Sequence, residues 1–99
     1  MKHPLVVRDE LREFIRHLPP ALKGKVRNVL EEIVEHPLCG KLLRDELSGL
    51  RSYRIGSMRI AYRVHERVVA LVTLGPRKTV YQQAALELKR QVETKQKGI

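Results

Sequence analysis

The chain has 99 residues, of which 42% are hydrophobic and 31% are charged. That length allows one domain, spanning residues 1–99, with a single modest core. The hydrophobic share excludes an intrinsically disordered chain. Twenty Lys and Arg against eleven Asp and Glu give a net charge of +9. Polyanions, meaning nucleic acid or an acidic protein, are the natural partners of such a surface, although a charge excess can equally serve solubility alone.

Cysteine usage and hydropathy exclude further classes of protein. The single cysteine, Cys39, rules out an internal disulfide, and the four histidines are too scattered to form a zinc site with it. We therefore expect no metal and no cofactor. The start of the chain, residues 1–7, is too short for a signal peptide, and no apolar run reaches transmembrane length. The sequence predicts a cytoplasmic protein without membrane association.

The first third of the chain predicts a strand followed by two helices. Residues 5–7 form a short apolar run, and Pro4 just before them favours a strand at a sheet edge. Asp9 offers a helix cap, and apolar residues then recur at helical spacing, namely Leu11, Phe14, Ile15 and Leu18. Residues 19–20 are both proline, which ends this helix and begins a second one that closes at residues 36–37. This helical hairpin has one apolar side, which needs a sheet to cover it.

The remainder predicts a β-meander and a last helix. Residues 38–49 are expected to be an irregular connection. Residues 52–55 and 58–64 alternate with a period of two around a tight turn at 56–57, and a second turn at 65–67 leads to residues 68–74. This last run is apolar on both faces, as in a central strand. Helical spacing then predicts a short C-terminal helix, and the polar tail 93–99 is expected to fray; the helical stripe is Tyr81, Ala84, Ala85, Leu88 and Val92. The fold class is therefore α+β: an N-terminal strand and a helical hairpin packed on an antiparallel meander.

The alternation also predicts where basic side chains lie. If Ile55 and Ile60 face the helices, then Arg54, Arg59 and Arg63 face the other way, so one sheet face carries the core and the opposite face carries arginines. Arg77 and Tyr81 follow the third meander strand, and we expect them to converge with Arg54 and Arg59 on one concave face. Such a cluster can bind a phosphodiester and stabilise a phosphorane-like transition state, while the tyrosine ring stacks on a base. Taken singly, each arginine is equally compatible with plain surface, and Tyr81 with a place in the helical stripe.

Two short blocks carry a family resemblance. Residues 50–62, LRSYRIGSMRIAY, and residues 75–81, GPRKTVY, resemble the L-x-x-Y-R-x-G-x-x-R-I-x-Y and G-x-R-x-x-x-Y blocks of RelE toxins of type II toxin–antitoxin systems. The order of expected elements matches that family over nearly the whole chain. The resemblance implies a ribosome-dependent mRNA endoribonuclease that inhibits translation, uses the substrate's own 2′-hydroxyl as nucleophile and needs no metal.

The resemblance also implies roles for individual residues. Arg54 and Arg59 would bind and stabilise the scissile phosphate. Arg77 would stabilise the leaving oxygen or pass it a proton, and Tyr81 would stack on or orient the substrate. Further RNA contacts are expected from three more basic residues, namely Lys78, Arg63 and Arg51.

The chain departs from the family pattern at the proton acceptor. Some relatives have a lysine where Gly56 stands here, and many have a histidine at the position of Pro76. Arginine stays protonated at ordinary pH and makes a poor base. Lys78 and Tyr81 remain as the acceptors that the sequence offers.

The family implies three partners. They are a cognate antitoxin, acidic and partly disordered, then the ribosome with its mRNA, and operator DNA through the antitoxin alone. Two alternatives stay open. The chain can be a ParE-like inhibitor of DNA gyrase without nuclease activity, or a catalytically weak relative that binds the ribosome or RNA.

Overall fold

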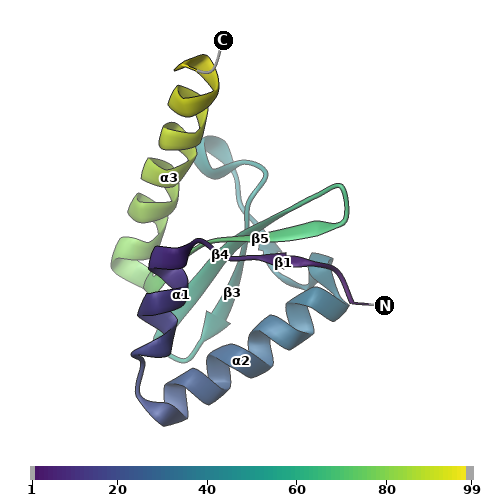
Figure 1. Cartoon of the computed structure of the whole chain (residues 1–99), viewed down its shortest axis with the longest axis vertical. Coiled ribbons are helices and arrows are strands. Elements are labelled where there is room, and N and C mark those ends of the chain that lie inside the picture. Colours follow the sequence, from purple (N-terminus) through teal and green to yellow (C-terminus); the bar gives the residue numbers. More distant parts are fainter. Residues whose placement is uncertain (1, 98–99) are drawn as a thin grey trace.

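The computed structural model describes the backbone of residues 2–97 and the side chains of residues 2–90. Its elements follow the expected order, which confirms the α+β fold class (Figure 1). None of the described helices is both long and apolar enough to cross a membrane. The elements are β1 (Leu5–Val6), α1 (Asp9–Arg16), α2 (Pro20–Glu35), η1 (Pro37–Cys39), β2 (Lys41–Leu42), η2 (Asp45–Leu47), β3 (Arg51–Ile55), β4 (Met58–His65), β5 (Val68–Pro76) and α3 (Arg77–Lys97).

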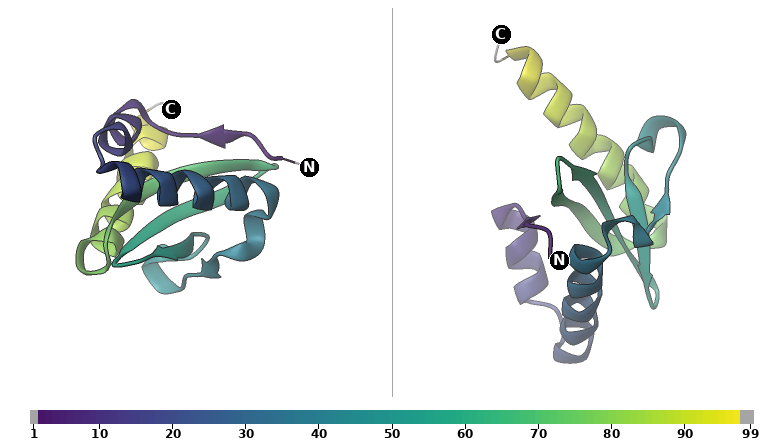
Figure 2. Two further views of the ribbon diagram at one scale, coloured as in Figure 1. Left: turned by 90° about the horizontal axis from the view of Figure 1, so that it is seen from below. Right: turned by 90° about the vertical axis from the view of Figure 1, so that its right-hand side faces the viewer.

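The five strands form one mixed sheet in the order β1-β5-β4-β3-β2. β1 pairs parallel with β5 and lies at the edge, as the sequence predicts, while the other neighbours pair antiparallel. Because β5 has a neighbour on each side and helices above and below it, apolar residues are needed on both of its faces. Figure 2 shows the reason: α1 and α2 cover one face of the sheet, and α3 crosses the other.

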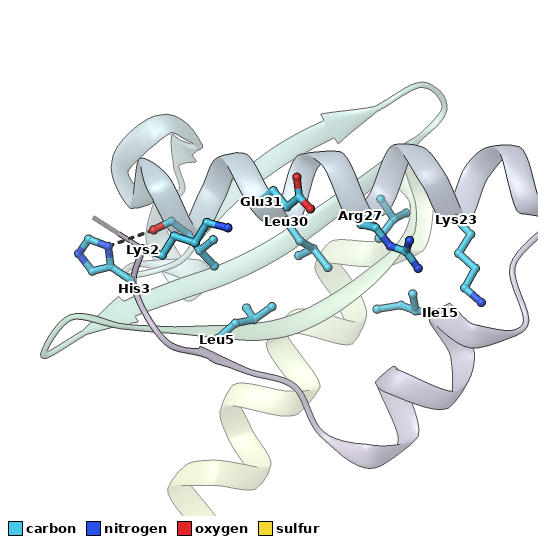
Figure 3. A pocket seen from close by; sticks show the side chains of 10 residues that line it. Lys2, His3, Leu5, Ile15, Lys23, Arg27, Leu30 and Glu31 are labelled. Carbon is cyan, nitrogen blue, oxygen red and sulfur yellow. Dashed lines mark hydrogen bonds between the residues drawn. The ribbon is translucent and has the colours of Figure 1, made fainter.

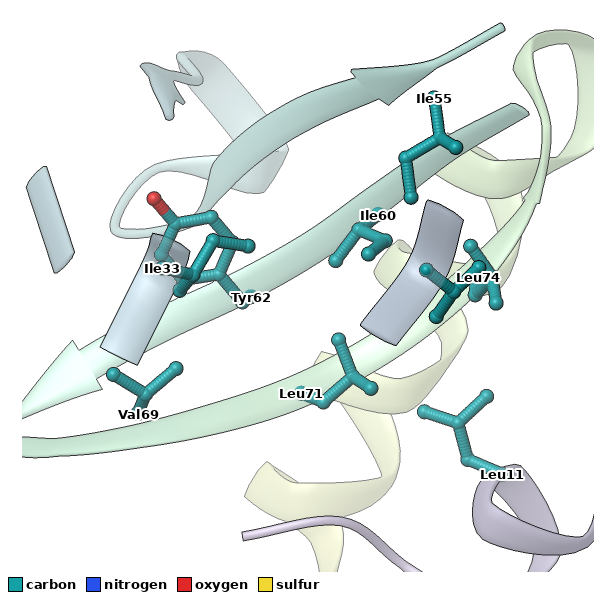
Figure 4. Packing of buried hydrophobic residues seen from close by; sticks show 9 residues of the cluster. Leu11, Ile33, Ile55, Ile60, Tyr62, Val69, Leu71 and Leu74 are labelled. Carbon is teal, nitrogen blue, oxygen red and sulfur yellow. The ribbon is translucent and has the colours of Figure 1, made fainter. Parts of the chain in front are cut away.

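The core between the sheet and the helical hairpin is the larger of two. Ile33 of α2 is fully buried and packs above Tyr62 of β4, while Leu11 of α1 closes the far end beside Leu74 (Figure 4). The spacing of buried residues in α2 is helical, and β4 contributes alternate side chains. In β5 the alternation shifts by one residue between Leu71 and Leu74, where the β4–β5 register is irregular. The buried members are Leu11, Val26, Ile33, Ile55, Ile60, Tyr62, Val69, Leu71 and Leu74.

A second, smaller core lies beneath α3. It contains Leu50, Ala61, Val72 and Ala84, flanked by partly buried Leu43, Leu47 and Leu88. The expectation that this face carries arginines alone is therefore wrong over much of the sheet. The fully buried Ala61 and Ala84 have small side chains that let helix and sheet approach closely. Arg54 and Arg59 lie at the end of this face where α3 begins, and Arg63 lies further along β4.

Three local expectations need correction. Arg8, not Asp9, occupies the N-cap of α1; Asp9 and Glu10 lie in its first turn, where carboxylates suit the helix dipole. The connection expected to be irregular contains η1, η2 and the short strand β2, which pairs with β3. The C-terminal helix is not short: α3 extends from Arg77 to Lys97 and includes most of the polar tail, because Lys, Gln and Glu favour helix. The fraying expected for residues 93–99 stays a prediction. The side chain of Val92 and residues 98–99 lie outside the described part.

The buried phenol of Tyr62 holds the connection between α2 and β3 against the core. Tyr62 is fully buried; its hydroxyl donates to the Pro37 carbonyl at 2.8 Å and accepts from the Gly40 N–H at 2.8 Å. A Cβ at Gly40 would lie 2.5 Å from that hydroxyl oxygen, so no larger residue fits here. Burial raises the pKa of Tyr62 to about 12. The phenol therefore stays neutral and keeps both hydrogen bonds at ordinary pH.

Candidate functional site

Three arginines meet where the β3–β4 hairpin approaches the start of α3. Arg54 and Arg59 are directly opposite each other in the β3–β4 register, so their side chains leave the same face of the sheet. Arg77 is the first residue of α3. Together they line a hollow of about 80 Å³, completed by Gly56, Ser57 and Met58. We call Arg54, Arg59 and Arg77 the arginine cluster.

Local backbone geometry brings the cluster together. The β3–β4 turn is short because Gly56 adopts φ +58, a conformation that glycine enters without strain. β5 ends at Pro76 and α3 begins at the next residue, so Arg77 stays at the sheet end beside this turn. The first turn of α3 contains no acidic residue. The unpaired N–H groups at this helix start favour an anion.

The positive charge of the arginine cluster favours binding of an anion. Among the side chains that the structure describes, no carboxylate forms an ion pair with any of the three guanidinium groups. Arg54 Nε donates to the Gly56 carbonyl at 3.1 Å, and Arg59 Nη1 donates to Ser52 Oγ at 3.4 Å. Both contacts orient the guanidinium groups without neutralising them. The three positive charges around one hollow repel one another, and a bound phosphate would offset this repulsion by attracting all three.

Tyr81 joins the cluster through one buried serine. Its hydroxyl lies 3.3 Å from Ser52 Oγ, the same atom that accepts from Arg59. Ser52 is only 3% exposed, so the oxygen that joins the two side chains is largely shielded from water. Sequence reasoning missed Ser52, although strand alternation places it on the same face as Arg54. The structure thus brings together all four residues predicted to be catalytic.

The three residues predicted as further RNA contacts lie elsewhere. Arg51 donates from Nη1 to the carbonyls of Gly40 at 2.9 Å and Leu38 at 3.3 Å, so it supports the connection. Arg63 follows Arg59 by four residues on the same strand, which places it about 13 Å along the sheet. Lys78 is exposed in the first turn of α3 and does not line the hollow.

A separate apolar groove lies on the opposite side of the sheet. It has a volume of about 390 Å³ between α2, β1 and α1, with Leu5, Ile15 and Leu30 in its lining (Figure 3). Its lining includes none of the predicted site residues. Among the side chains of residues 2–90, no group of three His, Cys, Asp or Glu is placed to hold a metal ion.

Comparison with known proteins places the chain in a family. The family model described as the ParE toxin of type II toxin–antitoxin systems matches residues 6–81, a segment that includes the arginine cluster and ends at Tyr81. No curated protein matches the sequence significantly.

Solved structures of toxins share the fold. The toxin–antitoxin complex RelBE2 of Mycobacterium tuberculosis matches with a TM-score of 0.68 and 27% identity, over 78% of this chain and 100% of that chain. A mutant of the Escherichia coli toxin RelE in its free state matches with a TM-score of 0.72 and 23% identity, over 91% and 98% of the two chains. The RelE–RelB complex of Pyrococcus horikoshii matches with a TM-score of 0.65 and 20% identity, over 78% and 97%. On the sequence match and the shared fold, the chain belongs to the ParE toxin family of type II toxin–antitoxin systems, within the RelE/ParE superfamily.

Proposed function

We propose that this toxin is a ribosome-dependent endoribonuclease that cuts mRNA and so inhibits translation. The observation that carries the proposal is the arginine cluster, free of carboxylates and joined to Tyr81 through Ser52. A protein that only inhibits another protein has no need of three guanidinium groups around a hollow of phosphate-like size. A nuclease needs this arrangement, because its transition state carries more negative charge than its substrate.

The proposed reaction is a transesterification within the RNA. The 2′-oxygen of one nucleotide attacks the adjacent phosphorus, and the bond from phosphorus to the 5′-oxygen of the next nucleotide breaks. The products are a 2′,3′-cyclic phosphate and a free 5′-hydroxyl. Arg54 and Arg59 hold the non-bridging oxygens, and Arg77 stabilises the charge that develops on the leaving 5′-oxygen. Tyr81 stacks on the reacting nucleotide and orients it.

Proton transfer is the weaker part of this site. The six residues that line the hollow include no carboxylate, imidazole or lysine, and guanidinium groups do not act as bases. We assign the 2′-hydroxyl proton to water, and water likewise supplies the proton for the leaving oxygen. The rate then comes from charge stabilisation and from the ribosome holding the substrate in an attack geometry.

Two kinds of partner follow from the proposal. RelBE2 of M. tuberculosis and RelE–RelB of P. horikoshii were solved as complexes of a toxin with its antitoxin, and we propose that a cognate antitoxin likewise holds this chain inactive. The net charge of +9 suits an acidic antitoxin segment and equally suits ribosomal RNA. Operator DNA would be contacted through the antitoxin.

Mapping of mRNA 5′ ends after induced expression tests the nuclease. We expect breaks within the ribosomal decoding site for the wild-type chain and none for Arg77→Ala. Arg12→Ala is the matched control, since it removes the same charge from an exposed position on α1. The proposal is wrong if Arg77→Ala folds and still cuts, or if neither protein yields such breaks.

A second candidate is inhibition of DNA gyrase, favoured by the description of the matching family. In that case induction causes DNA breaks and a DNA-damage response, while mRNA 5′ ends remain unchanged. If expression neither cuts mRNA nor damages DNA and growth continues, the chain is a binding relative without toxicity.

A further inference from the structure

A second hollow borders the arginine cluster on the far side of Tyr81. It has a volume of about 550 Å³ and lies between η2 and the first turns of α3. Tyr81 lines it and also reaches Ser52 at 3.3 Å, where Arg59 donates at 3.4 Å. Two hydrogen bonds therefore link Tyr81, which lines this hollow, to the guanidinium group of Arg59. One nucleotide is long enough to place its base in the hollow and its phosphate at that guanidinium group. The lining is Glu46, Leu47, Tyr81, Gln82, Ala85, Leu86 and Lys89.

The lining of this hollow suits a flat heterocycle. Leu47, Ala85 and Leu86 supply an apolar surface next to the Tyr81 ring, and Leu86 leaves 51% of its surface exposed to solvent. Unstacked bases bind proteins by stacking on aromatic rings beside apolar side chains, with polar groups at the base edge. Here those polar groups are Glu46, Gln82 and Lys89 at the rim.

Glu46 is the unexpected member, because an acid next to a cationic site repels a polyanionic substrate. It makes no ion pair with any side chain in the described part of the chain, although Lys89 lines the same hollow. Its position is fixed by a strained turn: Asp45 has φ +57, and the Ser48 N–H donates to the Asp45 carbonyl at 3.1 Å. Leu47 anchors the same turn on the second core.

We propose that this hollow binds guanine, from the nucleotide whose 3′-phosphate lies at the arginine cluster, and that Glu46 reads the base. A carboxylate accepts hydrogen bonds and donates none. Guanine presents two adjacent donors, N1–H and N2–H, which match the two carboxylate oxygens, whereas adenine, cytosine and uracil lack such a pair. The inference rests on the proposed function, since it takes RNA as the substrate, and adds a base preference that the function alone does not require.

Nucleotide binding tests the inference without the ribosome. The full-length chain is titrated calorimetrically with guanosine 3′-monophosphate and adenosine 3′-monophosphate at one fixed salt concentration. We expect the guanosine compound to bind about tenfold more tightly, the effect of one additional charge-assisted hydrogen bond. Glu46→Gln should bring the two affinities within about twofold. Asp45→Asn removes the same charge from the neighbouring residue, tolerates positive φ, and should keep the full preference.

The outcomes separate this inference from the nuclease proposal. Equal affinity of the wild-type chain for both nucleotides, or an unchanged preference in Glu46→Gln, overturns guanine recognition and leaves the phosphate site standing. Arg77→Ala should weaken both nucleotides equally. If neither nucleotide binds the wild-type chain, the arginine cluster does not bind phosphate, and the nuclease proposal fails together with the inference.

Discussion

Replacing Tyr62 by phenylalanine removes one oxygen atom from the centre of the fold. That oxygen donates to the Pro37 carbonyl and accepts from the Gly40 N–H, each at 2.8 Å, in a side chain with no exposed surface. The variant leaves two backbone groups without their partner. A buried polar group left unpaired costs about 1–3 kcal/mol. We therefore expect a loss of about 2–4 kcal/mol, since the Pro37 carbonyl can recover part of its loss from solvent.

Thermal and denaturant unfolding at neutral pH measure this loss. For a domain of this size, 1 kcal/mol corresponds to about 4–8 °C in Tm, so Tyr62→Phe should melt at least about 8 °C below the wild type. Tyr53→Phe is the matched control: its hydroxyl donates to Glu32 Oε2 at 2.7 Å, but at the surface, where water replaces the contact. If both variants lose the same stability, the connection is not held by the buried phenol.

The pH dependence gives an independent check. The folded-state pKa of Tyr62 is raised by burial to about 12 from the ordinary value of 10.0. A raised pKa contributes stability that is complete below pH 10 and is lost as the pH rises from 10 towards 12, by about 1.4 kcal/mol per pH unit. Tyr62→Phe has no phenol at this position to ionise. The stability gap between wild type and variant should therefore narrow as the pH rises from 10 towards 12, and a constant gap would contradict the argument.

Three further substitutions have predicted effects. Gly40→Ala places a methyl group against the Tyr62 hydroxyl, and should destabilise the chain by about 2 kcal/mol or more in denaturant unfolding. The β4–β5 turn holds Glu66 at φ +48 and Arg67 at φ +67; Asn and Gly at these two positions should raise stability by about 1 kcal/mol, measured as a higher denaturant midpoint. Ser52→Ala breaks the bridge between Arg59 and Tyr81, and should lower mRNA cleavage about tenfold while circular dichroism stays unchanged; full activity would show that the bridge is dispensable.

Much of the fold follows from hydrophobic periodicity. The alternation in β3 and β4 correctly separates Ile55 and Ile60 from Arg54 and Arg59, because period-two patterns fix the facing of each side chain. Periodicity does not show which element packs against each face of the sheet. Ala61 alternates onto the same face as Arg59, yet it is fully buried under α3. Small residues contribute little to hydrophobic periodicity, so the burial of Ala61 could not be predicted without the position of α3.

The site was predictable to the extent that it depends on strand facing. Arg54 and Arg59 could be paired from the hairpin register, and Arg77 from its place just after β5. The hydrogen bonds of Arg51 could not be predicted, because its Nη1 contacts carbonyls of a connection for which the sequence predicts no regular structure. The hollow beside Tyr81 was equally invisible, since Glu46 reaches it through a turn whose Asp45 adopts an uncommon backbone conformation.

The direct junction between Pro76 and α3 makes the site conditional on the helix. Arg54 and Arg59 belong to the sheet, whereas Arg77 and Tyr81 belong to α3, whose apolar contacts form the smaller of the two cores. Any ligand that lifts α3 from the sheet takes half of the site with it and leaves the other half in place. Activity can thus be switched off from a surface that never contacts the RNA, at the energetic cost of exposing Leu50, Val72 and Ala84 unless the ligand covers them itself.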